Sequence, residues 1–188
     1  MGVPLSVPRR TLTVDEYRKI GAAGGFREDD RIELIEGELV KMAPNGGKHL
    51  RLVNVLSGIL AREAGAAAVV STQNPVSLPP DNEPQPDIAL LTPDFADRDD
   101  IPSARDVLLI VEVADTTLVY DRDTKVPLYG RLGIPEVWVV DAQTETVSIY
   151  LEPGPKGYRR LLTPDKNEIL TPSLMPEVKV RLSDIWRK

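Results

Sequence analysis

The 188-residue sequence contains no cysteine and a single histidine, His49. The lack of cysteine excludes a disulfide framework, a thiolate metal site and a cysteine nucleophile. A single histidine excludes the usual zinc hydrolases, whose metal needs at least two imidazole ligands. No apolar run reaches 18 residues, and the N-terminus lacks the charged, apolar and small-residue blocks of a signal peptide. We therefore expect a cytoplasmic protein that makes no contact with a membrane.

Several common catalytic motifs are also missing. The sequence has no Walker loop, no Gly-x-Gly-x-x-Gly and no Gly-x-Ser-x-Gly, which disfavours nucleotide-driven enzymes and serine hydrolases. The net charge is −6 and the isoelectric point is about 4.9, which argues against a protein that coats nucleic acid. A nuclease is still compatible with this charge, because active-site carboxylates and metal ions invert the local field.

The patterns that are present predict one α/β domain over residues 1–188, with a mixed sheet and residues 1–10 as a flexible arm. Thr13 to Glu16 offers a capping box, and Glu36-Gly37 offers a hairpin turn. We predict helices near 13–20, 49–64 and 116–133, the last one with a kink or a late helix start at Pro127. We predict a hairpin over 31–40, strands over 66–78, 86–91, 107–113 and 136–141, and a C-terminal antiparallel extension through 147–151, 158–162 and 178–182.

The central apolar run, residues 107–113, carries the clearest functional signal. It is typical of a strand that is buried on both faces of a sheet, yet it contains Glu112. An ionised carboxylate is costly there unless it is paired, hydrogen-bonded or bound to a metal. A turn or a solvated surface does not explain Glu112, so the two readings are a buried salt bridge and a functional ligand.

Asp87 and Lys125 indicate a functional site only in combination with Glu112. Asp87 follows Pro86 at the start of a predicted strand, where a turn residue is the ordinary reading. Lys125 lies four residues after Asp121 on a predicted helix, where a surface ion pair is the ordinary reading. Tyr129 continues the same stripe. Two acids on neighbouring strands beside a lysine form an arrangement suited to cutting phosphodiesters.

Two further candidates are less specific. His49 lies on an apolar stripe at the start of a predicted helix, where a core-edge histidine and a position beside a phosphate are both compatible with the pattern. Glu33, Glu36 and Glu38 are three acids in one hairpin, and most acids in hairpins are solvated. Glu38 or Glu33 is the candidate to reach a site.

The motifs in order resemble the Uma-two family of restriction-endonuclease-like proteins. The matching residues are Glu33 to Val40, His49, Pro86-Asp87-Ile88, Ile110 to Val113, Tyr120 to Lys125, Leu128-Tyr129, Gly133 to Trp138 and Val140-Asp141, within roughly residues 12 to 186. The resemblance implies the fold of the PD-(D/E)XK nuclease superfamily, a mixed sheet flanked by helices. It also implies DNA as the substrate.

The resemblance further implies a site. Asp87 and Glu112 would bind Mg²⁺ or Mn²⁺ together with the Val113 carbonyl, and Glu38 and His49 would be accessory residues. The superfamily lysine normally lies two residues after the glutamate, where this chain has Ala114. Lys125 would replace it from the next helix, and Asp121 would position Lys125.

Three hypotheses follow from the sequence. The first is a metal-dependent DNA endonuclease. The second is a catalytically inactive module on the same fold that binds nucleic acid or protein. The third is a structural, oligomerising protein in which Glu112 forms an interior ion pair. The apolar strands and Trp186 also suggest a homodimer or a higher homo-oligomer.

Overall fold

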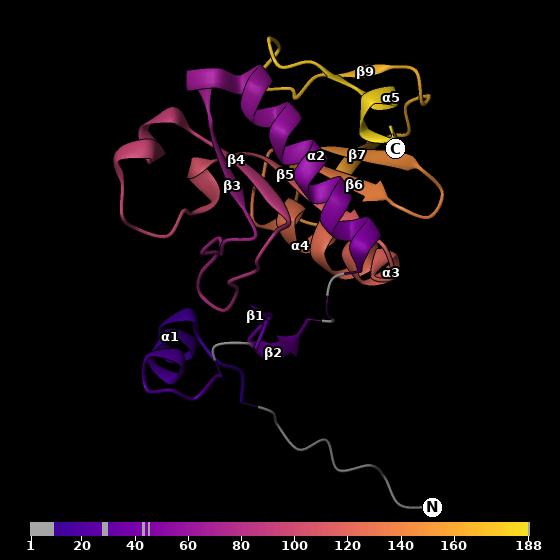
Figure 1. Cartoon of the computed structure of the whole chain (residues 1–188). Helices are drawn as coiled ribbons and strands as arrows, with labels where there is room; N and C mark the ends of the chain where they lie inside the picture. The colour runs from indigo at the N-terminus through magenta and orange to yellow at the C-terminus, as the bar shows by residue number, and fades with distance from the viewer. Residues whose placement is uncertain (1–9, 28–29, 43, 45, 188) are drawn as a thin grey trace, which may run out of the picture. The chain divides into compact units, whose positions relative to one another are not determined.

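The computed structural model describes residues 10–187 except 28–29, 43 and 45, and most of the predicted arm lies outside this part of the chain (Figure 1). The described residues group into two compact units. Unit 1 spans residues 1–43 and 77–84, and unit 2 spans 44–76 and 85–188. A single domain over the whole chain stays a prediction.

Unit 1 contains helix α1 (Val14–Ala22) and the hairpin of β1 (Ile32–Ile35) and β2 (Glu38–Lys41). Thr13 caps α1, and its backbone and side chain exchange hydrogen bonds with Glu16, which is the predicted capping box. The turn residues Glu36 and Gly37 both have positive φ angles, 49° and 75°, as a two-residue hairpin with the twist of its strands requires. Both local predictions are confirmed.

Unit 2 contains a six-stranded mixed sheet in the order β3-β4-β5-β6-β7-β8. Only β5 and β6 run parallel, and every other neighbouring pair is antiparallel. Strand β5 occupies the interior of the sheet, and both of its faces are buried, as the sequence predicted. The strands are β3 (Val69–Thr72), β4 (Ile88–Leu91), β5 (Val107–Ala114), β6 (Glu136–Asp141), β7 (Thr146–Gly154) and β8 (Gly157–Leu162).

Helices cover the sheet of unit 2, so the predicted fold class, an α/β mixed sheet flanked by helices, is confirmed (Figure 1). Helix α2 (Gly47–Ala64) packs its apolar stripe against β3 and β5. Leu109, Val111 and Val113 join the core under α2, so the alternation of the strand turns Ile110 and Glu112 toward the other face. The smaller helical elements are η1 (Gly65–Ala67), η2 (Pro93–Asp97) and η3 (Ala104–Asp106).

The C-terminal segment adds a two-stranded sheet and a short helix. Strand β9 (Ile169–Leu170) pairs antiparallel with β10 (Val180–Arg181), and α5 (Leu182–Ile185) follows. Val180, Leu182 and Ile185 are buried in the same core as α2. The antiparallel extension predicted from the sequence is therefore present as β7, β8 and this small sheet.

The prediction of one long or bent strand from residue 66 toward residue 78 is wrong. Residues 65–67 form a 3₁₀ turn and β3 ends at Thr72. Gln73 follows with a φ angle of 54°, in the left-handed region, which ends the extended backbone of the strand. Val76 and Leu78 continue the apolar pattern of the sequence and are buried, but they lie in the loop that follows the strand.

The crossover between the parallel strands β5 and β6 is a single irregular helix. It consists of α3 (Leu118–Tyr120), a π-helical turn η4 (Asp121–Lys125) and α4 (Val126–Arg131). Pro127 has no N–H, and its ring crowds the carbonyl four residues earlier, which disfavours a regular α-helix at this point. The wider turn, closed by the Val126 N–H on the Asp121 carbonyl, lies directly before it. The predicted irregularity at Pro127 thus takes the form of a π turn.

Helix α4 lies unusually close to the β7–β8 hairpin at Gly130. A Cβ at this position would lie 2.6 Å from the carbonyl carbon of Gly157. Since backbone cannot move aside as a side chain can, we expect Gly130→Ala to lower the free energy of unfolding by about 1–3 kcal/mol or more. Chemical denaturation measures this change.

Gly58, exposed in α2, is the matched control, since a Cβ there meets nothing within 4 Å. Gly58→Ala should stabilise the protein by up to about 1 kcal/mol, because alanine favours a helix over glycine. Equal effects of the two substitutions would contradict the close packing of α4 on the hairpin.

Candidate active site

Glu112 is the centre of a buried polar cluster in unit 2. The residue is 2% exposed on the interior strand β5. Its Oε1 atom accepts hydrogen bonds from Lys125 Nζ at 3.2 Å and from the Tyr129 hydroxyl at 2.7 Å. Both donors come from the crossover helix, four residues apart. Because Lys125 is fully buried as well, the two opposite charges compensate each other away from solvent.

Asp87 lies beside Glu112 on the neighbouring chain segment. It directly precedes β4, whose Ile88 pairs with Val111 of β5. The Asp87 N–H lies 3.4 Å from Glu112 Oε2. Asp87 and Glu112, which the sequence predicted on neighbouring strands, are therefore adjacent residues in the fold.

Three groups hold the Asp87 carboxylate. The Val113 N–H donates to Oδ2 at 2.9 Å, His49 Nε2 lies 3.0 Å from the same atom, and Gln73 Nε2 donates to Oδ1 at 3.3 Å. His49 reaches Asp87 from the first turn of α2 and is 7% exposed. The site thus draws on the start of α2, the end of β3, the start of β4, β5 and the crossover helix.

The electrostatics of Asp87 favour the ionised form. Burial disfavours a charge on this carboxyl group, but the hydrogen bonds and charge of His49 and the hydrogen bond of Val113 outweigh burial. The pKa of Asp87 therefore lies below its ordinary value, and the group is a carboxylate at neutral pH. An ionised oxygen donor of this kind suits a hard divalent cation.

Asp121 and Glu38 were also predicted to take part in the site. Asp121 is buried in the π turn and accepts a hydrogen bond from the Thr117 hydroxyl at 2.5 Å. Its predicted role in positioning Lys125 stays a prediction. Glu38 belongs to unit 1, where it begins β2 with an exposed side chain. Its accessory role also stays a prediction.

Two residues at the site were not among those selected from the sequence. Tyr129 was noted on the stripe of Lys125, and the spacing of four was the available signal. Gln73 had no signal, because its approach to Asp87 depends on the left-handed turn after β3, where its N–H also donates to the Asp87 carbonyl at 3.0 Å. Neither contact follows from residue type alone.

The number of side chains that could bind a metal ion at this site is small. Among the described residues, no group of three or more His, Cys, Asp or Glu side chains is arranged to hold a metal ion. The ligands predicted from the sequence are two carboxylates, a backbone carbonyl and waters. With only two such side chains, they would not form a group of three. Asp87 and Glu112 are adjacent hard oxygen donors, and this chemistry fits Mg²⁺ or Mn²⁺.

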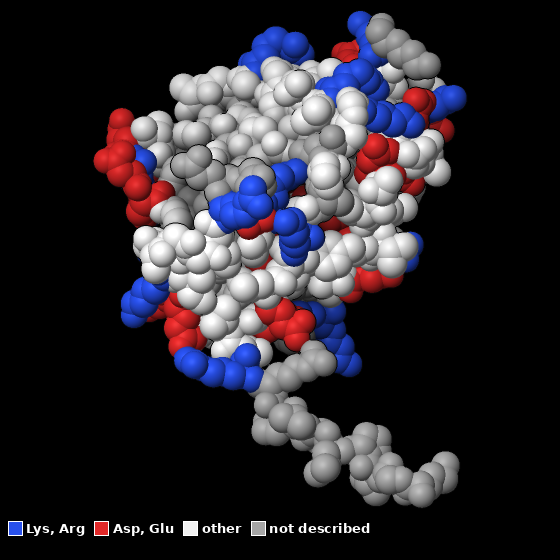
Figure 2. Space-filling view, turned by 60° about the horizontal axis from the view of Figure 1, so that its bottom comes forward, with Lys and Arg blue, Asp and Glu red and all other residues white. Residues whose placement is uncertain are grey.

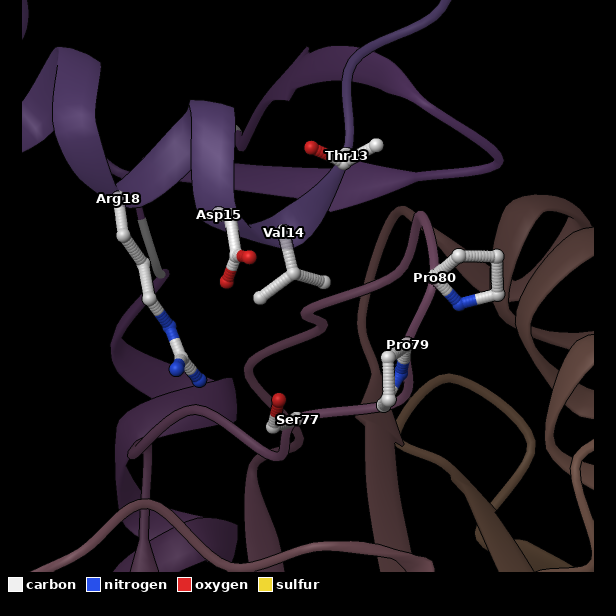
Figure 3. A pocket seen from close by; sticks show the side chains of 7 residues that line it. All are labelled: Thr13, Val14, Asp15, Arg18, Ser77, Pro79 and Pro80. Carbon is white, nitrogen blue, oxygen red and sulfur yellow. The ribbon is translucent and has the colours of Figure 1, made fainter.

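Unit 1 has a hollow of its own, with a volume of about 470 Å³ (Figure 3). The Arg18 side chain in it is bound to Glu83, through Nε at 2.8 Å and Nη2 at 2.5 Å. The residues that line this hollow are Thr13, Val14, Asp15, Arg18, Ser77, Pro79 and Pro80. Asp87, Glu112 and Lys125 are not among them.

The surface charge is mixed. Lysine and arginine side chains are interspersed with aspartate and glutamate on the face shown in Figure 2. Several basic side chains of unit 2 are paired with acids, among them Arg98 with Asp100 and Asp106. Within the part of the chain that the structure describes, no helix has the length and apolar character to cross a bilayer.

Comparison with known proteins agrees with the fold and with the family that the sequence resembles. A family model named Uma2, with the description "Putative restriction endonuclease", matches residues 14–183. A crystal structure from Anabaena variabilis, described as a "putative nuclease belonging to DUF820", superposes with a TM-score of 0.71 at 16% identity. That match covers 93% of this chain and 97% of the other. No curated protein matches. Because the family model spans most of the sequence, the chain belongs to the Uma2 family of restriction-endonuclease-like proteins.

Proposed function

We propose that this protein is a metal-dependent endonuclease that hydrolyses phosphodiester bonds of DNA. The observation that carries the proposal is the buried pair of Asp87, directly before β4, and Glu112 of β5, with Lys125 on one oxygen of Glu112. Membership of a restriction-endonuclease-like family supports a nuclease. Metal dependence, the choice of ion and DNA as substrate belong to the proposal.

The chain's own residues divide the work in this proposal. Asp87 and Glu112 would hold Mg²⁺ or Mn²⁺, with the Val113 carbonyl as a further ligand. When bound, the ion would act as a Lewis acid toward the scissile phosphate and activate water. Lys125 would stabilise the negative charge that develops on the phosphate oxygens or orient the attacking water. His49 and the Val113 N–H keep Asp87 ionised and fixed in place.

The direct test is cleavage of supercoiled plasmid by the full chain. With Mn²⁺ or Mg²⁺ we expect conversion to nicked and linear forms, and we expect EDTA to prevent it. Asp87→Asn removes one metal-binding charge with little change of shape, so cleavage should fall to the level seen with EDTA. Agarose gel electrophoresis follows the conversion over time.

Asp106→Asn is the control for Asp87→Asn. Asp106 is also a buried aspartate of unit 2, but its carboxylate accepts a hydrogen bond from the Ser103 N–H at the start of η3 and pairs with Arg98 at 2.8 Å. This variant should lose some stability and keep its cleavage activity. If the wild-type protein binds DNA but cuts none with either ion, the nuclease proposal fails and the inactive binding module is favoured.

A further inference from the structure

Tyr129 is placed to act on Glu112 together with Lys125. Its hydroxyl donates to Glu112 Oε1 at 2.7 Å, and its side chain is completely buried. Lys125 Nζ reaches the same oxygen at 3.2 Å. One carboxylate oxygen therefore receives two donors from one helix, at positions four residues apart on either side of the junction between η4 and α4.

The two oxygens of Glu112 thus face different partners. Oε1 is turned toward the crossover helix, and Oε2 lies on the side of Asp87, 3.4 Å from the Asp87 N–H. A glutamate side chain has three rotatable bonds, and two donors fixed to one oxygen restrict it to one orientation. This orientation turns Oε2 toward the backbone of Asp87, the residue whose carboxylate would share the metal.

We infer that Tyr129 is a positioning residue, which holds Glu112 so that Oε2 is the oxygen presented to the metal ion. The inference rests on the proposed function, since it assigns a role within the proposed metal site. Outer hydrogen-bond partners of metal-binding carboxylates orient the ligand, and their loss weakens metal binding by about 10- to 100-fold. Tyr129 would act through Glu112 and would not touch the substrate.

The test is Tyr129→Phe, which removes one buried oxygen and keeps the ring that fills the core. Calorimetric titration of the full chain with Mn²⁺ should show affinity about tenfold weaker than that of the wild-type protein. The Mn²⁺ concentration for half-maximal plasmid cleavage should rise by the same factor. The cleavage rate at saturating Mn²⁺ should stay within about threefold of wild type, because the group removed orients a ligand and does not react.

Tyr158→Phe is the matched control. Tyr158 is a second tyrosine of unit 2, and its hydroxyl donates to the Ile134 carbonyl at 2.7 Å. Its removal should leave the Mn²⁺ affinity unchanged. The rise in melting temperature on addition of Mn²⁺ offers a second measurement, since at one ligand concentration a tighter-binding ligand stabilises the folded state more. That rise should be smaller for Tyr129→Phe than for Tyr158→Phe.

The outcomes separate the inference from the proposed function. If the wild-type protein binds Mn²⁺ and Tyr129→Phe binds it equally well, Tyr129 is only a structural residue and the inference fails while the proposed function stands. If the wild-type protein binds no Mn²⁺, both fail. Weaker binding by Tyr129→Phe alone supports the inference.

Discussion

Glu112→Gln is expected to abolish binding of Mn²⁺ and Mg²⁺ and to lower the rate of DNA cleavage about a thousandfold, the loss that follows from several kcal/mol of lost transition-state stabilisation. Glutamine keeps the shape of the side chain and removes its charge. The buried Lys125 then lacks the carboxylate 3.2 Å away, so the protein should also lose about 3–5 kcal/mol of stability. Isothermal titration with Mn²⁺, the plasmid assay and chemical denaturation measure the three effects.

The control for this substitution lies on the neighbouring strand. Glu136 of β6 is as deeply buried as Glu112 and accepts hydrogen bonds from Trp138 Nε1 at 2.5 Å and the Ser173 N–H at 2.7 Å. Glu136→Gln should therefore destabilise the fold and leave metal binding intact. Metal affinity unchanged in Glu112→Gln would instead mean that Glu112 is a structural ion-pair partner, as in the third hypothesis from the sequence.

Lys125→Met should separate cleavage from metal binding. Methionine fills the space of the buried lysine stem without its charge, so the packing around the two carboxylates is kept while Glu112 loses its charged partner. We expect DNA cleavage to fall by about 10²–10³, the effect of removing one donor that stabilises developing charge. Mn²⁺ affinity should weaken by no more than about tenfold, since Lys125 also helps to hold Glu112 Oε1.

Lys41→Met serves as the comparison, because Lys41 of unit 1 forms an exposed ion pair with Asp30 at 2.7 Å. Such surface pairs contribute about 0–1 kcal/mol, so this variant should resemble wild type in every assay. Full cleavage activity in Lys125→Met would show that the displaced lysine has no part in the chemistry, and would leave only the metal-binding carboxylates to explain activity.

The sequence predicted the fold best where the signal was local or strongly periodic. The stripe of α2, the apolar run of β5 and the capping box of α1 each depend on neighbouring residues, and the structure contains all three. The prediction of a strand through residue 78 was wrong because the positive φ angle of Gln73 cannot be inferred from a glutamine in the sequence. The side chain of Gln73 reaches Asp87 only because of that turn.

Residue types alone identified the charges of the site but not their pairing. That Glu112 needs a partner followed from its burial in an apolar strand. The partner of Glu112 depends on which side chains of the crossover helix point toward β5. A π turn changes the direction of these side chains relative to a regular α-helix. The convergence of Lys125 and Tyr129 on one oxygen therefore became visible only in the structure.

The parallel pairing of β5 with β6 also determines when the site can form during folding. Two parallel neighbours must be joined by a crossover, and here that crossover carries Lys125 and Tyr129. The contacts of the site join residues separated by 13 to 38 positions, so their formation carries a larger loop-closure entropy than the β1–β2 or β7–β8 hairpins. We expect the hairpins and α2 to form early and the carboxylate cluster late, so that a partly folded chain does not yet hold together the residues proposed to bind a metal.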